Sequence, residues 1–197
     1  MIEPALLLQA YAAGWFPMGI EPDQGGGIEW FSPDPRGVLP LDDRFHVPTR
    51  LQRVLRQRRF DVRVDTRFGE VMRACAVRDE TWITPEILDS YLELHRLGHA
   101  HSVEAWRQGR LAGGLYGVAL RGAFFGESMF HEEADASKVA LCALVDRLRA
   151  RGYALLDIQW VTPHLAQFGA LQVRRKRYLK LLDESLKLNC SFTERTA

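Results

Sequence analysis

Three consecutive strand-like segments, followed by a helix and a fourth strand, restrict the folds open to this 197-residue chain. The segments alternate apolar and polar residues, and Gln108-Gly109 and Arg121-Gly122 have the composition of hairpin turns. The pattern predicts strands over residues 102–107, 111–120 and 123–130, a helix from Asp135 or Ser137 to about residue 151, and a strand over 154–160. Three antiparallel strands followed by a helical crossover indicate an α+β fold with a mixed sheet.

The amino-terminal part has mostly helical patterns. Apolar residues at helical spacing predict helices over residues 4–13, 49–59, 68–77 and 85–97, a strand over 60–64, and a last helix over 175–186. Residues 14–40 are rich in Gly and Pro, which predicts a long loop. This loop carries five large side chains, Trp15, Phe16, Met18, Trp30 and Phe31. A solvated spacer would be polar, so we expect the loop to pack against the rest of the chain.

The composition argues against several classes of protein. Twenty-six basic and 25 acidic residues leave a formal net charge of +1, so any attraction to nucleic acid must be local. The three cysteines are widely spaced without a CxxC motif, which favours reduced thiols over disulfides or a zinc site. Leu6-Leu7-Leu8 follows no basic region and is short. We therefore expect a cytoplasmic protein without a signal peptide or a membrane span.

Asp157 and Gln159 are the first candidates for catalysis. Residues two apart in an extended strand share one face, while Ile158 takes the other. The Asp157 carboxylate could then accept a hydrogen bond from the Gln159 amide and orient its oxygen toward an amine. A polar end of the sheet beside water is the alternative interpretation.

Glu127 is the second candidate, because it lies in the strongly apolar segment Phe124-Phe125-Gly126-Glu127-Ser128-Met129-Phe130. Burial there would raise the pKa of the carboxyl group unless a cation pairs with it. Such a group is suited to binding an amine or another cation. A salt bridge to an arginine elsewhere in the chain is the alternative.

Two groups of basic residues are candidates for binding phosphates. Arg50, Arg53 and Arg56 are spaced by three, opposite the apolar stripe of their predicted helix, and Arg174-Arg175-Lys176-Arg177 begins the last helix. Bidentate arginine contacts to phosphate would make RNA a candidate partner. Two solvated helix faces would explain the same residues without a ligand.

Several nucleotide and metal motifs are missing from the sequence. An acyl-CoA acetyltransferase has a glycine-rich pyrophosphate loop before the helix that follows residues 123–130. Here that loop is His131-Glu132-Glu133-Ala134-Asp135, and its three acids disfavour a pyrophosphate. The chain has no Walker A motif, Rossmann glycine pattern, GxSxG elbow or metal-ligand cluster. We expect neither a metal ion nor a cofactor.

Short motifs occur in a characteristic order between residues 11 and 170. They are Phe16-Pro17, Trp30-Phe31-Ser32-Pro33-Asp34-Pro35-Arg36, Thr81-Trp82-Ile83, Leu94-His95 with Gly98-His99-Ala100-His101-Ser102, Gly113-Gly114-Leu115-Tyr116-Gly117, Gly126-Glu127-Ser128-Met129-Phe130, Ala136-Ser137-Lys138 and Asp157-Ile158-Gln159. As an ordered set they resemble the bacterial leucyl/phenylalanyl-tRNA–protein transferases.

The resemblance implies both a fold and an activity. It implies a small amino-terminal domain, residues 1–35 with an alternative boundary near residue 60, and an acetyltransferase-like (GNAT-like) catalytic domain, residues 36–197. It implies transfer of leucine, or less often phenylalanine or methionine, from aminoacyl-tRNA to proteins that begin with Arg or Lys, which marks them for N-degron degradation. We expect a monomer. The alternatives are a CoA-dependent N-acyltransferase of the GNAT type and a non-catalytic RNA-binding protein.

The resemblance also implies roles for individual residues. It implies Asp157, Gln159 and Glu127 as the catalytic residues. Leu115, Phe124, Ser128, Met129 and Leu156 correspond to the pocket for the transferred side chain. Tyr11, Met18, Trp82 and Tyr91 correspond to residues near the tRNA end, and Arg50, Arg53 and Arg56 to basic residues that contact the acceptor stem. At the position of Met18 some relatives have tryptophan.

Overall fold

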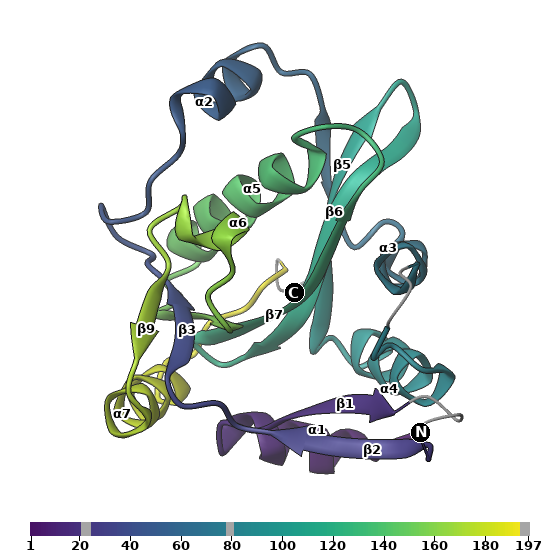
Figure 1. Cartoon of the computed structure of the whole chain (residues 1–197), viewed down its shortest axis with the longest axis vertical. Helices are drawn as coiled ribbons and strands as arrows, with labels where there is room; N and C mark the ends of the chain where they lie inside the picture. The colour runs from purple at the N-terminus through teal and green to yellow at the C-terminus, as the bar shows by residue number, and fades with distance from the viewer. Residues whose placement is uncertain (21–24, 78–80, 194–197) are drawn as a thin grey trace.

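A mixed β-sheet forms the centre of the computed structural model, which describes residues 1–20, 25–77 and 81–193 (Figure 1). Within these residues the sheet has seven strands in the order β4-β5-β6-β7-β8-β3-β9. Their bounds are β4 Asp61–Val64, β5 Ala100–Arg107, β6 Arg110–Leu120, β7 Ala123–His131, β8 Leu155–Gln159, β3 Arg36–Leu39 and β9 Leu171–Val173. The α+β class predicted from the sequence is confirmed.

The predicted run of strands is also confirmed. β5, β6 and β7 pair antiparallel in succession, and β7 pairs with β8 in parallel after the crossover helix α5, Ala136–Ala150. Gln108 and Gly109, between β5 and β6, both have positive φ angles, 50° and 76°. This is the geometry that a two-residue hairpin turn requires, and it explains the Gln-Gly sequence.

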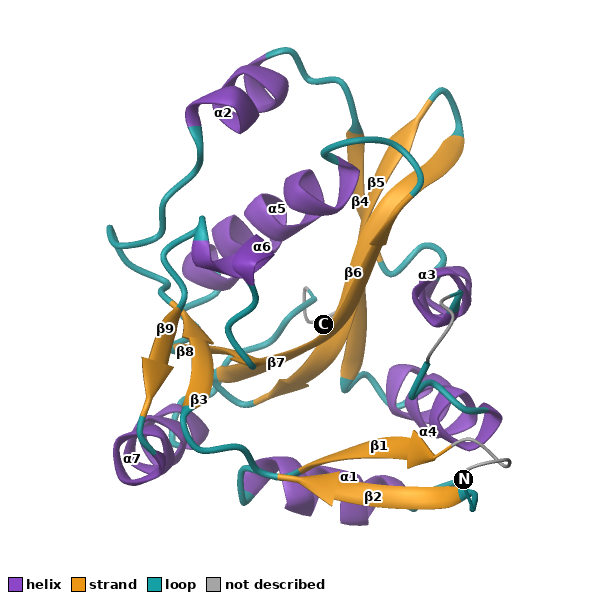
Figure 2. Ribbon diagram, viewed as in Figure 1, coloured by secondary structure: helices purple, strands orange, loops and turns teal. Residues whose placement is uncertain are grey.

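Helices cover both faces of the sheet (Figure 2). α5 and α2, Thr49–Arg56, pack on one face, where Leu51 and Val54 of α2 join the same apolar core as α5. A second core holds α1 (Pro4–Ala12), α3 (Phe68–Ala76), α4 (Pro85–Arg96) and α7 (Arg175–Leu186) against the sheet. None of the helices in the described ranges is long and apolar enough to cross a membrane.

The prediction of a single loop over residues 14–40 is wrong. β1 (Phe16–Ile20) and β2 (Gly27–Phe31) form an antiparallel hairpin, and β3 lies inside the main sheet between β8 and β9. β3 is only four residues long and wholly buried, so it shows no alternation of apolar and polar residues. Its hydrogen-bonding partners come more than 100 residues later in the chain, where local composition cannot reveal them. Helix α6 (Pro163–Ala166) and β9 were also missed, because both are short.

Candidate active site

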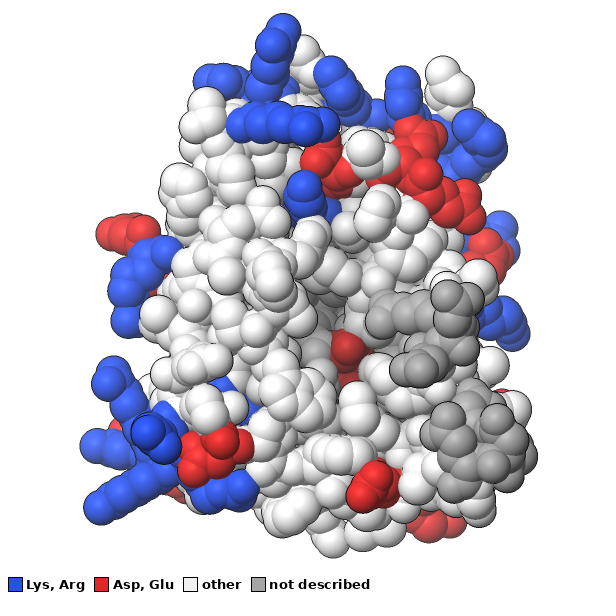
Figure 3. Space-filling model, in the orientation of Figure 1, with Lys and Arg blue, Asp and Glu red and all other residues white. Residues whose placement is uncertain are grey.

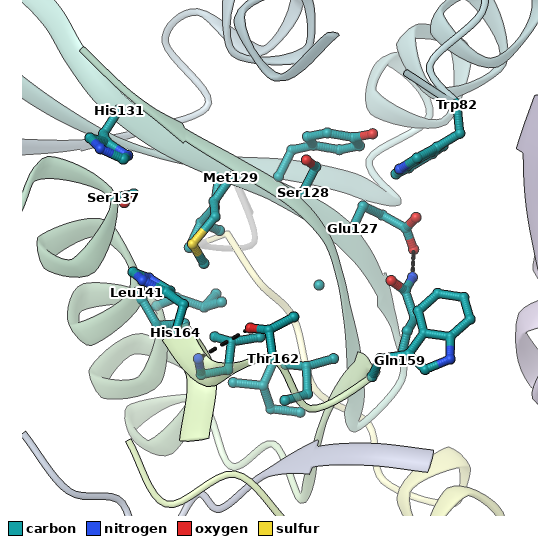
Figure 4. A pocket seen from close by; sticks show the side chains of 18 of the residues that line it. Trp82, Glu127, Ser128, Met129, His131, Ser137, Leu141, Gln159, Thr162 and His164 are labelled. Atoms are coloured by element: carbon teal, nitrogen blue, oxygen red, sulfur yellow. Dashed lines mark hydrogen bonds between the residues drawn. The ribbon is translucent and has the colours of Figure 1, made fainter. Parts of the chain in front are cut away.

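A cavity of about 430 Å³ opens where β7 and β8 separate (Figure 4). The two strands pair only from Ala123 to Phe125 on β7 and from Leu155 to Asp157 on β8. β7 then continues to His131, and its residues Gly126–Met129 and His131 line the opening. The topology therefore places the Gly126–Phe130 motif and the end of β8 around one hollow.

The inner wall of the cavity is apolar. It is formed by Leu115, Met129, Leu141, Leu144, Leu156, Ile158 and Leu165. Leu115, Ser128, Met129 and Leu156, four of the residues predicted for the side-chain pocket, line this cavity, and Phe124 does not. Phe124 is fully buried and stacks on Phe192 with 5.2 Å between ring centroids. It belongs to the same apolar core as Leu115, Leu141 and Leu156, but it lies deeper in that core than the cavity surface.

Sequence reasoning missed part of this lining. Leu141 and Leu144 of α5 belong to an apolar helix that is buried along most of its length. No local signal separates a leucine that lines a cavity from one that fills a core. His131, Ser137 and His164 also line the cavity, at the end away from Trp82 (Figure 4).

Glu127 and Gln159 meet at the Trp82 end of the cavity (Figure 4). Glu127 Oε1 accepts hydrogen bonds from Tyr11 Oη at 2.7 Å and from Gln159 Nε2 at 3.0 Å. Tyr91 Oη lies 3.4 Å from Glu127 Oε2 and is hydrogen-bonded to Tyr11. Burial raises the pKa of Glu127 to about 7, although the hydrogen bonds from Tyr11 and Gln159 lower it.

The pKa prediction for Glu127 is thus confirmed. Its alternative, a salt bridge, is not formed with any residue that the structure describes.

Asp157 lies behind this pair, fully buried, and does not line the cavity. It accepts hydrogen bonds from Arg36 Nε at 2.9 and 3.1 Å, from Tyr178 Oη at 2.6 Å and from the Gln159 backbone N–H at 2.8 Å. The predicted hydrogen bond from the Gln159 side-chain amide to Asp157 is wrong, since that amide donates to Glu127. The reason is local: Gln159 has a φ of 62°, so the strand alternation ends there and the side chain turns toward β7.

Arg36, which lies behind the cavity, is a charged residue of this site that sequence reasoning also missed. Its guanidinium is fully buried, donates from Nη1 to the Gly14 carbonyl oxygen at 3.0 Å, and lies 4.8 Å from the ring centroids of both Phe16 and Tyr178. The one sequence signal is its place at the end of the Ser32–Arg36 motif, directly before a short apolar stretch. Arg36 joins the amino-terminal segment, β3, β8 and α7 at one charged centre.

The sequence comparisons agree with this arrangement of motifs. A family model described as "Leucyl/phenylalanyl-tRNA protein transferase" matches residues 38–183, and the model of that family's N-terminal domain matches residues 1–34. The chain belongs to this family. The resemblance drawn from the motifs is confirmed, as is the expectation of an enzyme, an aminoacyltransferase.

Two relatives named leucyl/phenylalanyl-tRNA–protein transferase match over almost their whole length. The protein of Herpetosiphon aurantiacus is 53% identical and is matched over 97% of this chain and 98% of its own. That of Gloeobacter violaceus is 52% identical, with 97% of each chain covered. Among solved structures, the C-terminal domain of a putative lysylphosphatidylglycerol synthetase from Agrobacterium fabrum has a TM-score of 0.44 and 13% identity, covering 94% of this chain and 58% of that one.

Of the aromatic residues expected near the tRNA end, two are inaccessible in the transferase. Tyr11 and Tyr91 have no exposed surface, and their hydroxyl groups surround Glu127 instead. In this structure their hydroxyl groups hydrogen-bond a buried carboxylate, and their role near the tRNA end stays a prediction. Met18 and Trp82 do line the cavity.

The expected basic face on α2 is present. Arg50, Arg53 and Arg56 are exposed, while Leu51 and Val54 turn inward. Figure 3 shows Lys and Arg side chains gathered at the end of the molecule where Figure 1 places α2. Arg50 lies 3.8 Å from Asp135.

The acidic loop before α5 is less repulsive than its sequence predicts. Glu133 pairs with Arg107 at 2.6 Å, and Asp135 pairs with Lys138 at 3.2 Å. These ion pairs compensate two of the three acids, so charge alone is a weak argument against an anion at this loop.

Proposed function

We propose that the transferase moves leucine, and also phenylalanine or methionine, from aminoacyl-tRNA to the α-amino group of proteins that begin with Arg or Lys. The observation that carries the proposal is the contact between Glu127 and Gln159 at one end of an apolar cavity. The modified proteins enter N-degron degradation, and the enzyme works as a monomer in the cytoplasm. It needs no metal ion or cofactor, since the ester of aminoacyl-tRNA is already activated.

The cavity accounts for the transferred side chain. A volume of about 430 Å³ lies within the range of about 300 to 1,000 Å³ that is usual for small-ligand sites. Leu115, Met129 and Leu156 offer apolar contacts to a side chain that is not branched at Cβ, such as that of leucine, methionine or phenylalanine. Such contacts favour leucine over valine, which is one methylene smaller, by only about 1 to 3 kcal/mol in the free energy of the transition state.

The reaction is the aminolysis of an ester. The neutral α-amine of the acceptor attacks the ester carbonyl carbon, a new C–N bond forms, and the C–O bond to the ribose breaks. The proton lost from the amine passes to the ribose oxygen that leaves. An α-amino group has a pKa of about 7.7 to 8.0, so only a minor fraction of it is neutral at pH 7. Holding the two reactants in the right geometry can lower the activation free energy by about 7 to 11 kcal/mol.

Gln159 orients the attacking amine. Its Nε2 is engaged by Glu127, which leaves Oε1 as the acceptor for an N–H of the amine. Asp157 holds the backbone of Gln159 in its left-handed conformation through the Gln159 N–H. Asp157 is therefore a positioning residue, and Arg36 and Tyr178 hold it in turn.

Glu127 binds the amino group before attack. The pKa of the Glu127 carboxyl group, about 7, is close to the pKa of an α-ammonium group. The carboxylate can therefore accept a proton from the ammonium group. Tyr11 and Tyr91 keep the carboxylate oriented and lie too deep to meet the substrate.

The terminal adenosine of the donor tRNA reaches the cavity wall, and the rest of the tRNA lies outside the cavity. Met18 and Trp82 contact the terminal adenosine, and Arg50, Arg53 and Arg56 bind phosphates of the acceptor stem. Residues 1–35 form the small amino-terminal domain, and residues 36–197 form a catalytic domain of the GNAT-like type. The order of three antiparallel strands, a crossover helix and a parallel strand supports this last assignment.

The test measures transfer of labelled leucine from leucyl-tRNA to peptides that begin with Arg, Lys or Asp. We expect transfer to the Arg and Lys peptides only, and a loss of kcat on the order of 100-fold in Gln159→Ala. Gln9→Ala is the matched control, because Gln9 is an exposed glutamine on α1. Full activity of Gln159→Ala, or saturable binding of acetyl-CoA with acetylation of the peptide, would contradict the proposal.

A further inference from the structure

The rim of the cavity carries a large exposed side chain without a role in the proposed chemistry. Trp160 follows Gln159, lines the cavity and leaves 41% of its surface exposed. Its ring meets Phe16 edge-on with 5.3 Å between centroids, and it meets Phe31 at 6.4 Å. These contacts hold the indole in place. A fixed and partly exposed indole is a surface on which another planar ring can stack.

A second unassigned feature is the group of cations at the start of α7. Arg174, Lys176 and Arg177 are exposed and form no ion pair with any residue in the described ranges. Figure 3 shows Lys and Arg side chains gathered where Figure 1 places α7, on the same face of the molecule as the central hollow. Like charges held together on a surface repel one another, and binding an anion relieves the repulsion.

Hydrogen bonds connect helix α7, which carries the cations, to the two segments next to the Trp160 indole. Tyr178 of α7 donates to Asp157, which lies three residues before Trp160 in the chain. Arg175 donates to Ser32 Oγ at 2.9 Å, and Ser32 follows Phe31, on which the indole packs. Trp160 and the start of α7 therefore keep a constant position relative to each other and to Gln159.

We propose that Trp160 and the start of α7 form a second RNA subsite, beside the one for the terminal adenosine. Trp160 stacks on the nucleobase that precedes the adenosine, and Arg174, Lys176 and Arg177 bind phosphates of the strand that leads away from it. This subsite rests on the proposed function, since it extends the donor site.

The acceptor protein and the donor tRNA are the two substrates that could occupy this subsite, and their charges favour the tRNA. An acceptor that begins with Arg or Lys carries positive charge at the end that enters the cavity, and three exposed cations would repel it. The donor carries one negative charge per nucleotide. No Lys or Arg is among the described residues that line the cavity, so the phosphates of the donor need cations outside it. Stacking on an indole requires an unpaired base, which the single-stranded 3′ end of tRNA supplies.

The test of the stacking contact compares two donors, leucyl-tRNA and leucyladenosine, which lacks the preceding nucleotide. Stacking of one base on an aromatic ring is worth about 1 to 3 kcal/mol. We expect Trp160→Ala to raise KM for leucyl-tRNA about tenfold more than it raises KM for leucyladenosine. Trp160→Phe keeps a ring against Phe16 and recovers part of the loss. Trp15→Ala is the control, since Trp15 is 43% exposed and is not among the residues that line the cavity.

The cations are tested by charge reversal. The test variant combines Arg174→Glu, Lys176→Glu and Arg177→Glu. Each contact to a phosphate of a single strand adds about 0.7 to the slope of log KM against log salt concentration. We therefore expect the slope for leucyl-tRNA to fall by about 2 in this variant. Arg73→Glu, on the exposed side of α3, keeps the slope of the unmodified enzyme.

Two results would overturn the subsite. One is an unchanged KM for leucyl-tRNA in Trp160→Ala, and the other is an equal loss with both donors, which would place Trp160 at the adenosine or in the cavity wall. Failure of the proposed function looks different, because the unmodified enzyme would then transfer leucine from neither donor.

Discussion

Two buried carboxylates lie on neighbouring strands of the transferase, and they differ in the charge of their hydrogen-bonding partners. Asp157 on β8 has no exposed surface and contacts the Arg36 guanidinium. Glu127 on β7 is 8% exposed, and its hydrogen bonds come from two phenols and an amide, all neutral. A buried carboxylate without a cation is costly in its charged form, so the pKa of Glu127 rises to about 7.

Burial by itself therefore does not make a carboxyl group reactive. Asp157 is neutralised by a cation and closed off from the cavity, which suits a supporting role. Glu127 can change its protonation state near neutral pH and faces the cavity. The comparison predicts different responses when each carboxylate loses a partner.

The largest effect is expected from Arg36→Met. This variant leaves Asp157 as a buried charge without a cation, which costs about 3 to 5 kcal/mol of unfolding free energy. Urea unfolding measures the loss. Arg44→Met is the control, because Arg44 pairs with Asp42 at the surface, where the side chains are 64% and 56% exposed, and should cost less than about 1 kcal/mol. Equal losses in the two variants would show that Arg36 does not stabilise the protein through Asp157.

The next effect concerns Glu127 and pH. Its pKa is higher in the folded protein than in the unfolded chain, so the folded state holds the proton more tightly between about pH 4.5 and pH 7. The free energy of unfolding therefore falls as pH rises through this window, by up to about 3 kcal/mol. In Glu127→Gln this fall should disappear, and so should the ionisation near pH 7 in the rate of transfer. A variant with the same pH dependence as the unmodified enzyme would contradict the assignment.

The smallest effect is expected when the two tyrosines that hydrogen-bond the carboxylates, Tyr11 and Tyr178, are each replaced by phenylalanine. Tyr11→Phe removes a hydrogen bond that lowers the pKa of Glu127, so the rise of activity with pH should move to higher pH. Tyr178→Phe removes the bond to Asp157, costs about 1.5 to 3 kcal/mol of stability and leaves the pH profile in place. Paired pH–rate and unfolding measurements test both. A shifted profile in Tyr178→Phe would mean that the two carboxylates titrate together.

The parts of the site that were predictable have local signals. Glu127 stands out because its neighbours in the chain are apolar, and that setting is enough to predict a raised pKa. Ser128 and Met129 follow from the same motif. Gln159 could be named as a candidate, but its direction could not, because a single left-handed residue reverses the alternation of a strand.

The parts that were not predictable depend on contacts between distant segments. Phe124 and Leu141 are both apolar residues of regular elements, and only the separation of β7 from β8 makes one a core residue and the other part of the cavity. The family resemblance implies that Tyr11 lies near the tRNA end, yet in the structure its side chain is buried against a carboxylate 116 residues away.

The sequence by itself determined the family, the α+β class, the three hairpin-linked strands with their crossover helix, and the residues that carry polar groups into apolar strands. These follow from periodicity, turn composition and ordered motifs, which act over a few neighbouring residues. Only the tertiary structure decided that β3 enters the sheet, that Arg36 meets Asp157 across 121 residues, and that Gln159 turns to Glu127. The physical reason is that strand pairing and the burial of charge depend on which distant segments fold together.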